Sequence, residues 1–94
     1  MDFATLFSTK PLFLAPMDDI TDYPFRVMAR RMGADVVCTE FTSAEAIIRR
    51  VEKALRQVQV RADEHPAGIQ LFGAVETSMA EAARIVEEYQ PDFI

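Results

Sequence analysis

The chain has 94 residues, half of them apolar, which is the composition of one soluble globular domain or of part of a larger one. Its net charge of -5 argues against an intact module that binds nucleic acid by charge alone. The single cysteine, Cys38, belongs to no CxxC or Cys/His cluster and the longest apolar run is too short to span a bilayer, so we expect a cytoplasmic protein without metal or membrane role.

Short apolar runs predict strands in three places, residues 11–16, 35–39 and 68–72, and a fourth strand begins at residues 92–94. Each run is nearly continuous rather than alternating, which is typical of strands buried on both faces of a parallel sheet. The four predicted strands begin 24, 33 and 24 residues apart, a spacing that matches successive βα units. The sequence therefore predicts a parallel α/β fold in which the first three strands are neighbours in chain order.

Three segments between the strands place apolar residues at helical spacing: residues 25–32, 44–55 and 79–86. The first follows Asp22 and is closed by Gly33 as a C-terminal cap. Capping boxes, in which a hydroxyl and a carboxylate satisfy each other's free amides, open the second at residues 42–45 and the third at residues 78–81. We therefore predict one continuous helix for each segment.

Two features lie outside these elements. Residues 57–61 alternate polar and apolar side chains, which predicts a short exposed strand, and residues 62–66 have the composition of a turn. Residues 23–61 carry a net positive charge, whereas the flanking segments are acidic. The basic side chains fall on the outer faces of predicted helices, where a solvated surface is a better explanation than a binding patch.

The candidate site lies at the C-terminal ends of the predicted parallel strands, where such sheets carry their functional residues. Pro16 and Met17 end the first strand with a fixed ring and a polarizable thioether, which either form a flat wall for an aromatic ligand or pack into the core. Gln70 is the only polar side chain of residues 69–72, so a buried amide there needs a partner. That partner is either the polar edge of a heterocycle such as a flavin or neighbouring backbone.

The other polar residues near these ends favour structural roles. Glu40 either acts as a base or hydrogen-bond acceptor or caps nearby amides, and the structural role is favoured. Asp18, Asp19 and Asp22 cluster without the further ligands of a calcium loop, which favours loop charge and helix capping over a metal site. Cys38 lies within a strand and is expected to be a buried, inert thiol. Neither a GxGxxG nor a P-loop pattern is present, which disfavours a dinucleotide-binding fold.

Taken in order along nearly the whole chain, six segments resemble the opening of a tRNA-dihydrouridine synthase: residues 14–26 (LAPMDDITDYPFR), 33–40 (GADVVCTE), 43–45 (SAE), 69–73 (IQLFG), 79–83 (MAEAA) and 91–94 (PDFI). No single motif would suffice, but the set is specific. The resemblance implies that residues 1–94 are the N-terminal fragment, about three and a half βα units, of an FMN-binding (β/α)8 TIM-barrel domain.

Members of that family are cytoplasmic, RNA-binding flavoproteins of tRNA processing, oxidoreductases that use FMN and NADPH to reduce particular uridines of tRNA to 5,6-dihydrouridine. By this resemblance Pro16, Met17 and Asp18 would line the isoalloxazine, and Gln70 would hydrogen-bond its polar edge. The family usually has a small residue and a glycine at the two positions after Met17. Its catalytic cysteine, its phosphate-binding loops and most of its tRNA contacts would follow Ile94, so we expect no catalytic residue in this segment and no activity from it alone.

Two other functions are compatible with these residues. One is another FMN barrel oxidoreductase that acts on a small molecule, which the absence of the cysteine segment from the whole protein would indicate. The other is a short non-catalytic module that binds a partner through its unpaired strand edges. Reading the coding sequence beyond residue 94 would distinguish all three functions.

Overall fold

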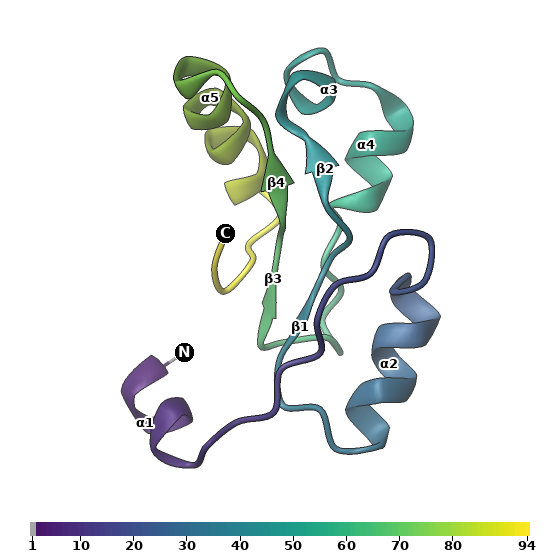
Figure 1. Cartoon of the computed structure of the whole chain (residues 1–94), viewed down its shortest axis with the longest axis vertical. Coiled ribbons are helices and arrows are strands. Elements are labelled where there is room, and N and C mark those ends of the chain that lie inside the picture. Colours follow the sequence, from purple (N-terminus) through teal and green to yellow (C-terminus); the bar gives the residue numbers. More distant parts are fainter. Residues whose placement is uncertain (1) are drawn as a thin grey trace.

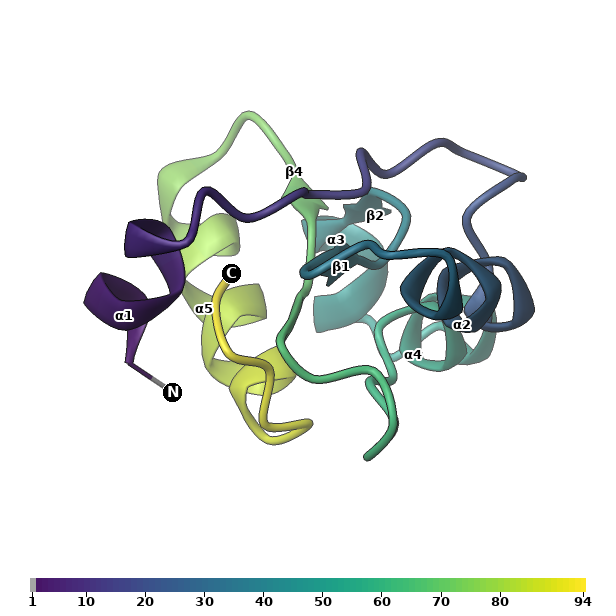
Figure 2. The same ribbon diagram turned by 90° about the horizontal axis from the view of Figure 1, so that it is seen from below.

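A computed structural model describes residues 2–94 of the chain. In chain order its helices and strands are α1 (Phe3–Ser8), α2 (Tyr23–Arg31), β1 (Val37–Cys38), β2 (Thr42–Ser43), α3 (Ala44–Ile48), α4 (Glu52–Gln57), β3 (Ala67–Gly68), β4 (Leu71–Phe72) and α5 (Glu76–Glu87) (Figure 1). The strands form a central column, with α1 and α5 on one side and α2 and α4 on the other, as the view from below also shows (Figure 2). Within the described residues, no helix is long and apolar enough to cross a membrane.

All strands of the described chain pair in parallel. From one edge of the sheet to the other, the paired segments occur in the order in which they follow along the chain. β1 pairs with β3, and β2 pairs with β4. Single bridges extend the first of these pairs on both sides, because Phe13 lies opposite Val36 and Phe93 lies opposite Gly68. Every pairing formed by residues 2–94 is parallel, which requires a crossover between successive strands. The predicted order of adjacent parallel strands is confirmed, and the fold is a mixed α/β fold.

The strands are shorter than predicted because side chains interrupt the backbone pairing. Between β3 and β4, the N–H of Gln70 donates to the hydroxyl of Thr39 at 3.3 Å instead of to a carbonyl. Regular backbone bonds continue on either side, from the Thr39 N–H to the Gly68 carbonyl at 2.9 Å and from the Thr42 N–H to the Gln70 carbonyl at 3.0 Å. The predicted strand 35–39 is therefore shortened to β1, and the predicted strand 68–72 is divided into β3 and β4.

The first predicted strand lies at an edge of the sheet and not in its interior. Residues 11–16 contribute a single bridge, and Leu12 and Phe13 are exposed, so the expectation that this strand is buried on both faces is wrong for the described chain. The segment still aligns with its neighbour, because Leu14 N–H donates to the Val36 carbonyl at 2.9 Å. An edge strand has one neighbour, which explains the sparse pairing.

The helix predicted over residues 44–55 is two helices. Arg50 adopts a left-handed φ of 55°, and Val51 then has an extended conformation that begins α4. Ser43, and not Thr42, is the N-cap of α3, where its hydroxyl accepts the Ala46 N–H at 3.4 Å. Periodicity missed the break because the apolar side chains of α3 and α4 face the same core on both sides of the turn.

Two further local predictions are wrong, and three are confirmed. α5 begins earlier than its predicted capping box, and its N-cap Val75 makes no side-chain cap bond. Residues 57–61 form the end of α4 and a connection, not a strand, although the turn that follows is present. α2 begins as predicted with Asp22 accepting the Phe25 N–H at 3.1 Å, and it is closed by Gly33 at a φ of 114°.

The apolar core is built by α3, α4, α5 and the strands, and its buried members are Ala44, Ile47, Ala54, Val58, Ile69, Ala82 and Val86. α2 contributes nothing apolar to this core. The side chains of its predicted apolar stripe, Phe25, Met28 and Met32, are exposed, with Met32 at 82%. Its one buried residue is Arg26. The one buried side chain by which α2 meets its neighbours is therefore charged.

Candidate functional site

Two of the predicted site residues line one cavity. Pro16, which follows the first strand segment, and Gln70, which follows β3, are part of the wall of a cavity of about 460 Å³. The rest of this wall is mainly apolar and comes from β1, the β3–β4 segment, α5 and the end of the chain: Cys38, Ile69, Leu71, Met79, Phe93 and Ile94. A concave, mostly apolar site with one polar group is the usual form of a small-molecule site.

Gln70 differs from its predicted environment. The sequence placed its amide in a buried strand, but the residue is exposed, while its neighbour Ile69 is buried in the helix-facing core. Successive side chains of a strand point to opposite faces, so Gln70 faces away from the core that buries Ile69. Its backbone groups bond Thr39 and Thr42, whereas its side-chain amide bonds no residue within 2–94. Both the donor and the acceptor of this amide are available to a ligand.

Met17 and Asp18 lie outside this cavity wall. Met17 is partly exposed, and Asp18 lines a second cavity of about 330 Å³ together with Asp19 and the exposed aromatic pair Phe41 and Phe72. The ring centroids of this pair are 4.9 Å apart. Of the four predicted ligand-binding residues, the structure thus places Pro16 and Gln70 in the wall of one cavity and Asp18 in the wall of the second. Met17 is in neither wall.

The loop that follows Met17 is closed by a buried threonine. The hydroxyl of Thr21 accepts the Met17 N–H at 2.9 Å and donates to the Met17 carbonyl at 3.2 Å. The backbone N–H of Thr21 also donates to that carbonyl, at 3.0 Å. Within the loop Asp19 has a left-handed φ of 62°, which glycine adopts without cost and Asp more readily than most residues. This φ explains the glycine that is usual at this position in the family resembled.

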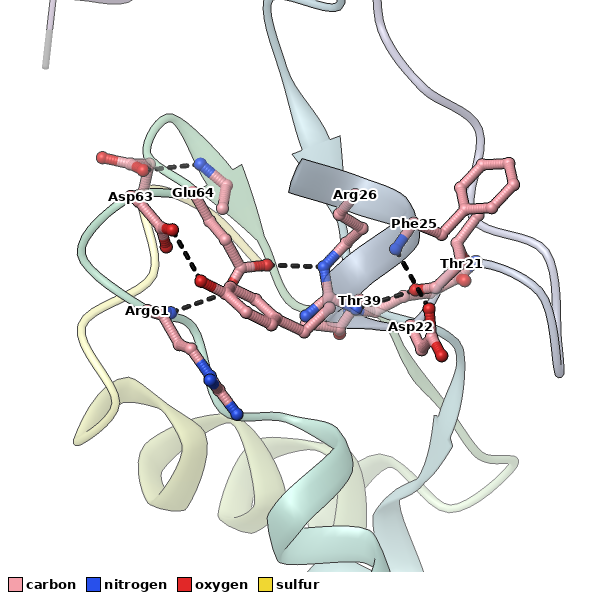
Figure 3. Close-up of polar contacts among 12 residues, drawn as sticks. Thr21, Asp22, Phe25, Arg26, Thr39, Arg61, Asp63 and Glu64 are labelled. Carbon is pink, nitrogen blue, oxygen red and sulfur yellow. Dashed lines mark hydrogen bonds and ion pairs between the residues drawn. The ribbon is translucent and has the colours of Figure 1, made fainter. Parts of the chain in front are cut away.

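A buried ion pair between Arg26 and Glu64 is bonded to the end of this loop at Thr21 (Figure 3). The Nε–H of Arg26 donates to Oε1 of Glu64 at 2.5 Å, and its Nη1 donates to the Thr21 carbonyl at 2.7 Å. The second carboxylate oxygen of Glu64 accepts the Arg61 N–H at 2.7 Å. All three side chains of the chain Glu64–Arg26–Thr21 are buried, with Arg26 only 4% exposed. The partners of this pair are 38 positions apart, so no local sequence pattern reveals it.

Next to the ion pair, α2 is also tied to the connection before β3. The Tyr23 hydroxyl donates to Oδ2 of Asp63 at 2.6 Å, and this hydrogen bond, together with burial, raises the pKa of Tyr23. The guanidinium of Arg61 lies over the Tyr23 ring, 3.9 Å from its centroid. One helix face therefore meets one connection through several polar contacts (Figure 3).

Glu40 does not line the Pro16–Gln70 cavity. It is 8% exposed, and its Oε2 accepts the side-chain N–H of Gln57 in α4 at 3.2 Å. Among the described residues its Oε1 has no partner, and Glu40 lines a polar cavity of about 120 Å³ together with Arg26 and Arg61. This position favours the structural role over that of a base in the Pro16–Gln70 cavity.

Cys38 is in β1, as predicted, but it is only half-buried and lines the larger cavity. Burial raises the pKa of its thiol, although a hydrogen bond from the Gly68 backbone and the charge of Arg26 act in the opposite sense. A raised pKa keeps the sulfur protonated and weakly nucleophilic. Within residues 2–94, no group of three or more His, Cys, Asp or Glu residues is arranged to hold a metal ion.

Comparison with known proteins gives one family. A family model described as "Dihydrouridine synthase (Dus)" matches residues 13–94. Among curated proteins, the chain is 37% identical over 86 residues to a probable tRNA-dihydrouridine synthase of Rhodobacter capsulatus, covering 89% of this chain and 26% of that protein. It is 35% identical over 89 residues to a probable tRNA-dihydrouridine synthase of Aquifex aeolicus, covering 94% and 28%, and 33% identical over 73 residues to tRNA-dihydrouridine synthase B of Xanthomonas campestris, covering 78% and 22%. The chain thus spans about a quarter of the length of the curated relatives it matches.

Proposed function

Because the chain belongs to the dihydrouridine synthase family, we propose that it forms the FMN-binding beginning of an oxidoreductase that reduces uridines of tRNA to 5,6-dihydrouridine. The observation that carries this proposal is the shared cavity of Pro16 and Gln70 at the ends of parallel strands. We propose further that residues 1–94 are the first three and a half or so βα units of a (β/α)8 barrel. The parallel pairing of segments in chain order supports that assignment.

The residues of this cavity fit a flavin. Its volume of about 460 Å³ lies within the range typical of small-molecule sites. Pro16 supplies a rigid apolar wall for a flat ring, and the exposed Gln70 amide offers a donor and an acceptor to the polar edge of a heterocycle. Met17 adjoins that wall. Because Asp18 lines a different cavity, we propose that it contacts FMN through its backbone.

In the proposed reaction, residues 1–94 bind FMN and orient its ring system. FMN, when bound, supplies the hydride transfer between NADPH and the uracil ring of tRNA. Gln70 sets the orientation of the ring system, and Pro16 and the apolar wall exclude water from one of its faces. Cys38 is assigned no part in proton transfer; burial raises the pKa of its thiol and so makes it a weaker acid. The proton donor, the phosphate contacts and most tRNA contacts are assigned to later parts of the protein, which acts in the cytoplasm.

The direct test uses the intact protein that carries this chain. Incubation with FMN, NADPH and unmodified tRNA is expected to form dihydrouridine, which is measured by mass spectrometry of the digested tRNA. Bound flavin without dihydrouridine would instead indicate an FMN oxidoreductase that acts on a small molecule, and absence of bound flavin would indicate a binding module. Residues 1–94 alone are expected to show no turnover, because a closed barrel of this type needs about 250 residues.

Replacing Gln70 with alanine in the intact protein is expected to weaken FMN binding about 3- to 10-fold, the cost of one lost hydrogen bond. The change removes an exposed amide without opening the core, so the thermal midpoint of the FMN-free protein is expected to stay the same. Quenching of FMN fluorescence in a titration measures the dissociation constant. Gln59→Ala, which removes an exposed amide that follows α4, is the matched control. Equal FMN affinity of Gln70→Ala and wild type would contradict the role of this amide.

A further inference from the structure

Thr21 occupies a position that the cofactor proposal does not use. It is fully buried, yet it does not line the Pro16–Gln70 cavity. Its hydroxyl accepts the N–H of Met17 and donates to the carbonyl of the same residue. The N–H of Met17 belongs to the peptide unit that joins Met17 to Pro16. Fixing this N–H therefore fixes the plane of the peptide next to the cavity wall.

A hydroxyl suits this position for a simple chemical reason. It accepts and donates at the same atom, so one side chain satisfies both backbone groups of Met17. Because Thr21 is buried, water cannot easily replace the hydroxyl, and its loss leaves the Met17 N–H without its partner, whereas the Met17 carbonyl keeps the backbone N–H groups of Ile20 and Thr21. The loop that it closes also contains Asp19 in the left-handed region, a conformation that the surrounding contacts must maintain.

Thr21 is itself fixed by the buried ion pair. Arg26 donates to the Thr21 carbonyl at 2.7 Å, and Glu64 holds Arg26 at 2.5 Å (Figure 3). Glu64 lies in the connection that leads directly into β3, the strand that precedes Gln70. The series of contacts from Glu64 through Arg26 and Thr21 to Met17 therefore joins the two chain segments that end at the cavity.

From this geometry we propose that Thr21 is a positioning residue of the cofactor site, which acts through the Met17 backbone and is oriented by the Arg26–Glu64 pair. The proposal rests on the proposed function, because it assumes that FMN occupies the Pro16–Gln70 cavity. The role is indirect: Thr21 touches neither cofactor nor substrate, and it sets the Pro16–Met17 peptide against which the ring system packs.

Two substitutions at this position separate the hydroxyl from the shape of the side chain. In the intact protein, Thr21→Val keeps the shape and removes the hydroxyl, and it is expected to weaken FMN binding about 5- to 10-fold. Thr21→Ser keeps the hydroxyl, and its FMN dissociation constant is expected to stay within about 2-fold of wild type. The visible circular dichroism of the bound flavin, which reports ring orientation, is expected to change in the valine variant and not in the serine variant.

The matched control is Thr42→Val. Thr42 is also buried, and its hydroxyl bonds the Glu40 carbonyl and the Gln57 side chain, not the Met17 loop. We expect a loss of thermal stability similar to that of Thr21→Val, with unchanged FMN affinity. Equal weakening of FMN binding by both valine variants, or unchanged binding in Thr21→Val, would overturn the positioning role.

The remaining outcomes are also decisive. Failure of the wild-type protein to bind FMN overturns the proposed function itself. If Thr21→Val yields no folded protein, Thr21→Ser decides: binding within about 2-fold of wild type supports the role of the hydroxyl, and folded Thr21→Ser with binding more than about 10-fold weaker overturns it.

Discussion

Replacing Glu64 with alanine is expected to lower the free energy of unfolding by about 3–5 kcal/mol, the largest effect of any single substitution considered, because it leaves a buried charge without its partner. Glu64 is fully buried and accepts hydrogen bonds at both carboxylate oxygens, from Arg26 and from the Arg61 backbone. Without it, the buried guanidinium of Arg26 keeps one protein hydrogen-bond partner, the Thr21 carbonyl. Urea unfolding of the intact protein measures the loss.

The control for this substitution is the exposed ion pair of α4. Glu52 and Arg56 are 2.7 Å apart, and both side chains are largely exposed. Glu52→Ala is therefore expected to cost only about 0.3–0.5 kcal/mol, as exposed helix pairs do. The double substitution Arg26→Met with Glu64→Leu removes both buried charges and is expected to recover much of the stability lost in Glu64→Ala. A cost of Glu64→Ala no larger than that of Glu52→Ala would show that water reaches the ion pair.

Ile47→Ala is expected to cost about 2–5 kcal/mol, the range for truncating a buried aliphatic side chain. Ile47 is fully buried in the core cluster, where α3 packs against α5 and β2, so truncation of its side chain removes buried apolar contacts. Val51→Ala is the control, because Val51 is 45% exposed, and its expected cost is about 0.5 kcal/mol or less. Chemical denaturation of both variants measures the loss in the free energy of unfolding. Equal losses would contradict the burial of Ile47 in the core.

The strand order was predictable because it depends on local signals. Short apolar runs and the spacing between them gave the neighbouring parallel segments correctly. The break between α3 and α4 was not predictable in this way, because it depends on the left-handed backbone conformation of Arg50. Arginine adopts this conformation rarely, so its presence in the sequence does not indicate a break. The apolar stripe of α2 was recognised, but its direction was not, since the residue that faces the sheet is Arg26.

The candidate site was predictable where backbone position decides it. Pro16 and Gln70 were selected because they follow strands, and the parallel pairing brings those strand ends to one cavity. The burial of Gln70 was predicted wrongly, because a run of apolar neighbours does not show which of the two sheet faces a helix covers. The partnership of Arg26 with Glu64 depends on the folded chain, so no spacing rule reveals it.

The way in which α2 is attached has a consequence for the motions of the molecule. Its buried contacts are a salt bridge and hydrogen bonds, whereas the apolar core lies between the other helices and the strands. Detachment of α2 would uncover part of β1, whose Val37 is fully buried, but it would leave the core cluster covered. The free energy of this local opening would therefore change less with urea concentration than that of global unfolding. In native-state hydrogen exchange, the amides of α2 would thus form a separate cooperative unit, one that can open together with the Met17–Thr21 loop while the core remains folded.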